Sequence, residues 1–288
     1  MAGEYELDPG TQIGEDGLRG STLREQPPAA RIGHSIGALT LPIYHQVALD
    51  LHPSMLYISK FGKNSDIDAA STPEDIWDSG GLYTGFSTAA ETLSVVSAHA
   101  DDTNISGAGA WTVELQGLDV NFNIISETVT LNGTTPVVTT LPFIRCNRAI
   151  VRTAGANSEN TGIISVTQST SGDLHATIDA LHGQTAIAAY TVPNGYTGLL
   201  IFTHVLTTLT TGGNAAAEVD LRIRPEGAAW RSIENNFVSN GAPLVFDHTF
   251  PPVLASRTDA VVRCHQASAN NISISATFDI LLIPDELL

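Results

Sequence analysis

The most constraining feature of this sequence is a two-residue alternation of apolar and polar side chains that recurs almost to its last residue. In the stretch NISISATFDI, the residues Ile272, Ile274, Ala276, Phe278 and Ile280 alternate with serine, threonine and aspartate. Successive side chains of an extended chain point to opposite faces, so this pattern places one face on a core and one face in water. The alternation predicts a β-strand with Phe278 in its core.

Similar runs fill most of the chain. Trp111, Val113 and Leu115 alternate with Thr112 and Glu114, which predicts that Trp111 is also a core residue. Short strand-like runs separated by turn residues recur through residues 56–168 and again through 184–288. Many short strands with turns between them are typical of sandwiches and jelly rolls. The predicted fold is therefore all-β, with two antiparallel β-sandwich or jelly-roll-like domains at 56–168 and 184–288.

One turn is especially clear in the stretch ISETVTLNGTTPVV. Asn132 and Gly133 separate two runs rich in threonine and valine, and both residue types tolerate the positive φ of a tight turn. Val129 and Leu131 lie on one face of the first run. The pattern predicts a β-hairpin.

The stretch SGDLHATIDALHGQ breaks the strand pattern. Leu174, Ile178 and Leu181 are spaced as on one face of a helix, between Gly172 and Gly183. This spacing predicts a short helical joint over residues 169–183, between the two β domains.

Residues 1–55 differ from the rest of the chain because they are rich in glycine, proline and charge. They could form a tail without a partner, or an extended N-terminal arm that orders against a neighbouring subunit. Apolar residues at alternate positions, as on one face of an extended chain, favour the assembly arm. Pro42 within this run favours an edge or isolated strand. The arm residues are Leu39, Leu41, Ile43, Val47, Leu49 and Leu51.

The net charge argues against some partners. Thirteen basic and 30 acidic residues give a formal charge of −17. Phosphate backbones and anionic membranes require a basic surface, so neither nucleic acid nor membrane is an expected partner. The two cysteines, Cys146 and Cys264, are expected to be separate thiols. The N-terminal segment has no apolar core, so no signal peptide is expected.

No catalytic signature is found in the sequence, so no enzymatic activity, cofactor or metal is expected. Asp66 and Asp68 lie at alternate positions, as in the first part of a calcium loop. The glycine and closing glutamate of such a loop are missing at the required spacing. The alternative is an acidic surface loop, and whether these two aspartates bind an ion stays open.

Two segments resemble a family of virion structural proteins of tailed bacteriophages. The first begins at KFGKNSDIDAASTPEDIWDSGGLY and continues through AETL, and the second is GLDVNFNIISETVTLNGT. The later YTVPNGYTG and LRIRPEGAAW are similar to the second half of the same family. The resemblance covers residues from about 57 to the end. It implies a role in virion assembly, in particles assembled from proteins made in the bacterial cytoplasm.

These observations together favour a non-enzymatic virion protein whose partners are itself and other virion proteins. The leading hypothesis is an oligomeric tail-associated component, such as a fibre or adaptor, attached by its N-terminal arm. A capsid decoration protein is the alternative, and a carbohydrate-binding module for a host-surface glycan is a distant one. Arg222 and Arg224 are the interface candidates, because a guanidinium group can bind a carboxylate through two hydrogen bonds. The loops SDIDAASTPED and HADDTN are expected to keep their carboxylates in water, and association is expected to strengthen as salt screens this acidic surface.

Overall fold

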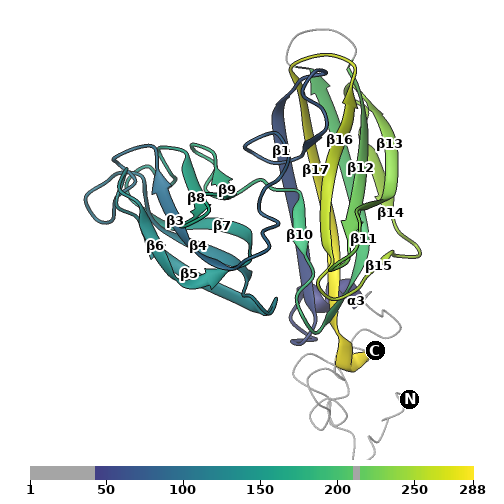
Figure 1. Cartoon of the computed structure of the whole chain (residues 1–288), viewed down its shortest axis with the longest axis horizontal. Coiled ribbons are helices and arrows are strands. Elements are labelled where there is room, and N and C mark those ends of the chain that lie inside the picture. The colour runs from purple at the N-terminus through teal and green to yellow at the C-terminus, as the bar shows by residue number, and fades with distance from the viewer. Residues whose placement is uncertain (1–42, 210–214) are drawn as a thin grey trace, which may run out of the picture. The chain divides into compact units, whose positions relative to one another are not determined.

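The computed structural model describes residues 43–209 and 215–288 of the chain. The chain divides into two compact units, Met1–Tyr57 and Ile58–Leu288. Antiparallel strands form nearly all of the described elements, which confirms the predicted all-β class (Figure 1). Leu39 and Leu41 of the predicted arm lie outside the described residues.

The first unit contains the helix α3 (Ile43–Ala48), so the predicted extended strand is wrong here. Residues four positions apart share a face in a helix as well as in a strand, and Ile43 and Val47 fit both patterns. In the sequence, Pro42 directly precedes Ile43, and proline suits the first turn of a helix. Val47 is buried, whereas Ile43 and Leu49 are exposed and Leu51 is half-buried.

The first sandwich lies in the second unit and consists of two sheets. Its four-stranded sheet has the order β6-β3-β8-β9, and its three-stranded sheet has the order β5-β4-β7. The strands are β3 (Glu91–Ser97), β4 (Ala110–Leu118), β5 (Ile124–Thr130), β6 (Val137–Phe143), β7 (Arg145–Ala154), β8 (Ile164–Gln168) and β9 (Leu174–Ile178).

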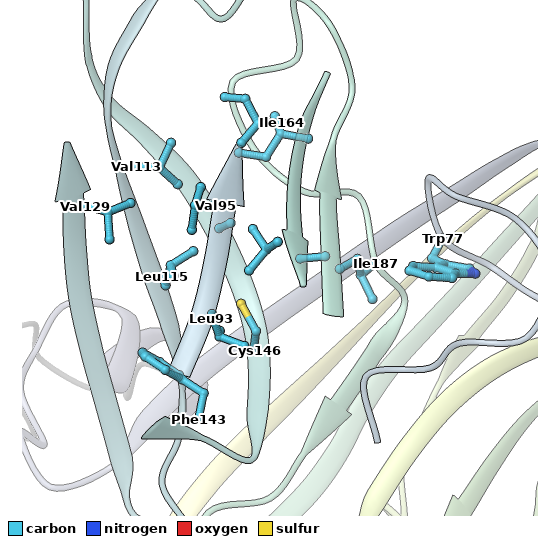
Figure 2. Close-up of a cluster of buried hydrophobic side chains, with 14 of the residues drawn as sticks. Trp77, Leu93, Val95, Val113, Leu115, Val129, Phe143, Cys146, Ile164 and Ile187 are labelled. Atoms are coloured by element: carbon cyan, nitrogen blue, oxygen red, sulfur yellow. The ribbon is translucent and has the colours of Figure 1, made fainter. Parts of the chain in front are cut away.

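Aliphatic side chains from both sheets fill the core of this sandwich (Figure 2). Leu93 and Val95 of β3 face inward from one sheet, and Val113 and Leu115 of β4 face inward from the other. All four are fully buried, as their two-residue spacing requires. Cys146 lies in the same core, and both cysteines are free and buried, which confirms the expectation of separate thiols.

The predicted hairpin at Asn132–Gly133 is wrong, although its turn is present. Gly133 has a φ of +57°, and Thr135 N donates a hydrogen bond to Asn132 O at 3.0 Å. However, β5 pairs with β4, and β6 pairs with β3 in the other sheet. The turn therefore carries the chain from one sheet to the other, and the buried Val129 and Leu131 lead into the core between them.

The predicted helical joint over 169–183 is also wrong, because Leu174–Ile178 forms strand β9 beside β8. Leu174, Ala176 and Ile178 are each two residues apart, so they also fit the two-residue period of one strand face. Pairing with β8 satisfies the backbone of this segment and buries both of its faces, His175 and Thr177 on one and Ala176 and Ile178 on the other. Tertiary pairing therefore outweighs the local helical spacing.

The second sandwich contains two five-stranded sheets. One has the order β1-β17-β11-β14 with β15 beside β11, and the other has the order β10-β16-β12-β13 with β2 beside β16. The strands are β1 (Leu56–Ile67), β2 (Glu74–Asp75), β10 (Ala189–Thr191), β11 (Tyr196–Leu209), β12 (Ala216–Arg224), β13 (Arg231–Ser239), β14 (Leu244–Asp247), β15 (Val253–Leu254), β16 (Asp259–Ala267) and β17 (Ile272–Pro284). A short 3₁₀ helix, Asp285–Leu287, follows β17.

Strands β1 and β2 belong to this second sandwich, although the sequence interpretation placed 56–168 entirely in the first domain. β1 is the hydrogen-bonded neighbour of β17, and Asp75 of β2 pairs with Arg263 of β16. The second sandwich is thus built from both ends of the 58–288 unit. Local alternation predicts strands but does not identify which distant strand completes a sheet.

The two predicted core aromatics differ in burial. Phe278 is fully buried on β17, as predicted. Trp111 is half-buried, and the register of β4 against β7 shifts on both sides of Thr112. Such a bulge interrupts the strict alternation of faces. The prediction that Trp111 is a core residue is therefore wrong, and its indole N–H instead donates to Gly107 O at 2.8 Å.

Candidate functional site

The buried carboxylate of Asp259 joins two arginines within the 58–288 unit. The Arg145 guanidinium donates from Nε to Asp259 Oδ1 at 3.2 Å and from Nη2 to Asp259 Oδ2 at 3.3 Å. Arg224 donates from Nη2 to Asp259 Oδ2 at 2.6 Å. Arg145 and Asp259 are almost fully buried, whereas the Arg224 side chain is 31% exposed. One carboxylate therefore holds two guanidinium groups, of which one reaches solvent.

The local sequence explains how these residues meet. Arg224 ends β12 and pairs in register with Asp259, which begins β16. Arg145 begins β7 of the first sandwich, and its Nη1 donates to Ser87 O at 2.6 Å. Thr191 of β10 completes the group by donating its hydroxyl to Asp259 Oδ1 at 2.6 Å. Buried charges of this kind require both a partner and full hydrogen bonding.

Aromatic rings surround the arginines. Arg145 lies over the rings of Phe86 and Phe122, with its Cζ 5.5 and 5.3 Å from their centroids. Arg224 lies 4.7 Å from the centroid of Trp230 and 5.7 Å from that of Phe86. Cation–π contacts of this length favour a positive charge at partly desolvated positions. The rings hold the guanidinium groups in place without neutralising them.

A cavity of about 530 Å³ opens beside this cluster. Its lining includes Arg145, Arg224 and Arg257 together with two carboxylates, Glu226 and Asp259. Three guanidinium groups and two carboxylates leave one surplus positive charge, in a chain whose net charge is −17. The cavity lining is therefore net positive, whereas the chain as a whole is net negative, and this lining suits an anion. We call it the arginine cavity.

The two interface candidates, Arg222 and Arg224, have different surroundings. Arg224 is engaged with Asp259 inside its own chain. Arg222 lies 5.5 Å from the centroid of Trp230, and its buried Nε has no hydrogen-bond partner among the described residues. The sequence analysis singled out Arg222 and Arg224, but no local pattern indicated that Arg145, Asp259 and Arg257 would gather around Arg224. Those residues come from turns and strand starts far apart in the chain.

The acidic stretches of the sequence are less exposed than predicted. Glu74 and Asp75 are buried, and Asp75 accepts two hydrogen bonds from Arg263 at 2.6 and 3.0 Å. Asp102 is also fully buried. The expectation that these loops keep their carboxylates in water is wrong for these three residues. Asp75 and Asp102 accept hydrogen bonds from distant segments, and Glu74 accepts them from the nearby Asn64 and Gly81.

The calcium hypothesis gains no support from the described residues. Asp68 Oδ1 accepts a hydrogen bond from Asn271 N at 2.9 Å, so this carboxylate closes a loop contact. Across residues 43–209 and 215–288, no group of three or more His, Cys, Asp or Glu side chains could hold a metal ion. Within the same ranges, no helix is long and apolar enough to cross a membrane.

A buried lysine lies elsewhere in the same unit. Lys60 is 3% exposed, and its Nζ donates to the carbonyl of Asn147. Burial, with Arg148 nearby, lowers the pKa of Lys60 to about 7, and burial raises the pKa of Asp78 to about 7. Neither group lines the arginine cavity. Since the amine is almost inaccessible, its placement indicates a structural role.

The strands β13, β14 and β15 lie at one edge of the second sandwich, which we call the open edge. β13 and β14 each end their sheet, and β15 lies beside β14 along the same strand, β11. His248 and Glu234 join the two sheets at this edge through a contact of 2.7 Å. Four apolar side chains of the open edge are exposed: Phe237, Val245, Phe250 and Val253. The two phenylalanines are 73% and 91% exposed, which is unusual for such large apolar groups.

Comparisons with known proteins do not assign this chain to a family. No family model matches, and no curated protein matches. Among solved structures, the infectious bursal disease virus VP2 subviral particle matches with a TM-score of 0.22 and 10% identity, over 80% of this chain and 72% of that chain. The Gx strain of the same virus matches with a TM-score of 0.23, also at 10% identity and over the same shares. Likenesses this weak establish neither a shared fold nor a shared function.

Proposed function

We propose that this chain is a non-enzymatic structural protein of a bacteriophage virion, and specifically an oligomeric tail-associated component such as a fibre or adaptor. The observation that carries the proposal is the open edge of the second sandwich. Among residues 43–209 and 215–288, two strands there have no neighbour on one side, and four apolar side chains are exposed beside them. The sequence resemblance to tailed-phage virion proteins supports the same assignment.

An exposed strand edge readily pairs with another chain. Monomeric proteins usually protect such edges with lysine, proline or inward charges. The open edge presents two exposed apolar side chains, Phe237 on β13 and Val245 on β14. Exposed apolar side chains together with unpaired backbone groups are typical of a surface that another protein covers. A second copy of the chain is the expected partner, and the N-terminal arm is expected to contact other virion proteins.

Sedimentation of the purified chain tests the association. We expect an oligomer at micromolar concentration, and we expect the double variant Phe237→Ser, Phe250→Ser to shift it toward monomer. Ile105→Ser is the matched control, since Ile105 is 79% exposed in a loop of the first sandwich. A monomeric parent chain, or equal effects of the two sets of variants, would contradict a role for the open edge.

Analysis of purified particles tests the location. Mass spectrometry should detect the chain in virions, and its abundance relative to the major capsid protein should match a tail component of a few to tens of copies. Hundreds of copies per particle would favour the capsid decoration alternative. Absence from purified particles would overturn the proposed function altogether.

A further inference from the structure

The arginine cavity holds donors that the fold does not use. Arg224 directs its Nε and Nη2 to Asp259 Oδ2, and its Nη1 has no hydrogen-bond partner among the described residues. Arg257 donates from Nε to Asn194 Oδ1 and from Nη1 to Glu226 Oε2, each at 3.1 Å, and its Nη2 has no partner in the same ranges. Both side chains are about one-third exposed. Two guanidinium groups with unused N–H donors therefore line one cavity.

The charge of the lining selects the class of anion. One surplus positive charge matches a monoanion, whereas a phosphate dianion would also be repelled by Asp259 and Glu226. A guanidinium group binds a carboxylate with a geometry that suits both partners. The carboxylate is therefore the anion that this cavity fits best.

The rest of the lining indicates what carries that carboxylate. The Thr88 hydroxyl lies on the lining beside the arginines, and Glu226, with a side chain 53% exposed, can accept hydrogen bonds from hydroxyl groups. Val120 offers an exposed apolar side chain on the same lining. A volume of about 530 Å³ is in the range of small-ligand pockets. A ligand with one carboxylate, several hydroxyls and an apolar ring face would use all three features.

We propose that the arginine cavity binds a sugar acid, a hexuronate whose carboxylate is held by Arg224 and Arg257 and whose hydroxyls contact Glu226 and Thr88. This inference stands apart from the proposed assembly function, because no residue of β13, β14 or β15 lines the cavity. The same chemistry is available from a free hexuronate and from an acidic polysaccharide.

Calorimetric titration of the full chain with galacturonate, galactose and acetate tests the recognition. Galacturonate is expected to bind with a micromolar to millimolar Kd. Galactose, which lacks the carboxylate, and acetate, which lacks the hydroxylated ring, are each expected to bind at least about tenfold more weakly. Equal affinity for galactose and galacturonate, or no binding of any of the three, would overturn the proposal.

Two variants separate the cavity from non-specific charge. Arg257→Gln is expected to weaken galacturonate binding about tenfold or more, because it removes one charged donor group. Arg152→Gln is the matched control, since Arg152 is also a partly exposed arginine paired with a glutamate, Glu114, but lies outside the cavity. Circular dichroism on both variants verifies that they fold. Equal loss in the two variants would overturn the assignment to the cavity.

Polymers identify the source of the ligand. Tighter binding of trigalacturonate than of galacturonate would support the proposal with an acidic polysaccharide as the source, and equal binding would support it with the free acid. Polyglutamate is the third probe. If polyglutamate competes at this site while galacturonate does not bind, the cavity accepts an acidic peptide and the proposal fails.

Discussion

Two buried aspartates, one in each sandwich, are stabilised by different donors. In the first sandwich, Asp102 accepts backbone N–H bonds from Ala110, Thr161 and Gly162 at 2.7, 2.8 and 2.9 Å, and a hydroxyl bond from Ser97 at 2.5 Å. In the second, Asp259 accepts from the side chains of Arg145, Arg224 and Thr191. Neutral donors surround one carboxylate, and two cations surround the other.

This difference separates a structural site from a binding site. The amides around Asp102 are fixed by the backbone, and the fit is so tight that a Cβ on Gly109 would lie 2.1 Å from Asp102 Oδ1. No ligand can enter there. Two guanidinium groups around one carboxylate leave a surplus charge and unused donors, and those donors face a cavity. A carboxylate whose hydrogen bonds are all made by neutral donors is therefore held rigidly. A carboxylate bound by more than one cation leaves positive charge that can bind an anion.

The largest expected effect is the loss of the Asp102 carboxylate. Asp102→Ala should lower the free energy of unfolding by about 3–5 kcal/mol, because it leaves several buried donors without an acceptor. Urea denaturation followed by circular dichroism measures this change. Asp101→Ala is the matched control, since its side chain is 54% exposed, and it should change stability by less than about 0.5 kcal/mol. Similar costs in both variants would show that the amide cluster is not what stabilises this loop.

The next effect concerns His175, which is fully buried in the first sandwich. Burial, together with Arg145, lowers the pKa of His175 to about 4 from its usual 6.5. A lowered folded-state pKa gives stability that is present above pH 6.5 and is lost as the pH falls toward 4. The shift corresponds to about 3 kcal/mol. We expect urea denaturation to show a loss of this size between pH 7 and pH 4, beyond the loss shown by His175→Gln.

The neighbouring His182 provides the control for this pH dependence. Its side chain is exposed, and its ring Nδ1 lies 3.1 Å from the carbonyl of Ala180. His182→Gln should keep the full pH dependence of the parent chain. If His175→Gln and the parent lose stability in parallel from pH 7 to pH 4, the buried imidazole does not determine the acid sensitivity.

These sites also show how far the sequence alone reaches. Alternation predicted the all-β class and the burial of Phe278, because those features depend on a local period. It failed at Leu174–Ile178, where helical and extended spacings coincide, and at Asn132–Gly133, where strand partners are distant. The sequence shows which residues are arginines. Their meeting at Asp259 depends on pairing between segments far apart in the chain, and no local pattern encodes it.

The difference in stability cost between one aromatic residue of each sandwich is expected to be smaller. Phe278→Ala in the second sandwich should cost about 3–5 kcal/mol, as full burial of an aromatic ring implies. Trp111→Ala in the first should cost about 1–2 kcal/mol, because the indole is half-buried at a bulge and its main polar contact is with Gly107 O. Urea denaturation of both variants measures the difference. Equal costs would mean that the bulge does not remove Trp111 from the core.

The smallest expected effect is the difference between Arg224, which Asp259 already binds, and Arg222, whose buried Nε has no hydrogen-bond partner among the described residues. Arg224→Gln should lower the free energy of unfolding by about 1 kcal/mol, since its loss leaves Asp259 with one cation, and Arg222→Gln should change it by less than about 0.5 kcal/mol. If Arg222 binds a carboxylate of a neighbouring subunit, its loss should instead weaken association.

Sedimentation of both variants between 50 mM and 500 mM salt separates these two effects. The parent chain should associate more strongly as salt screens its net charge of −17, and Arg222→Gln should show weaker association at every salt concentration. Arg224→Gln should sediment like the parent wherever it is folded. If Arg222→Gln unfolds more easily than Arg224→Gln, or if added salt dissociates the parent oligomer, the division between a folding arginine and an assembly arginine is wrong.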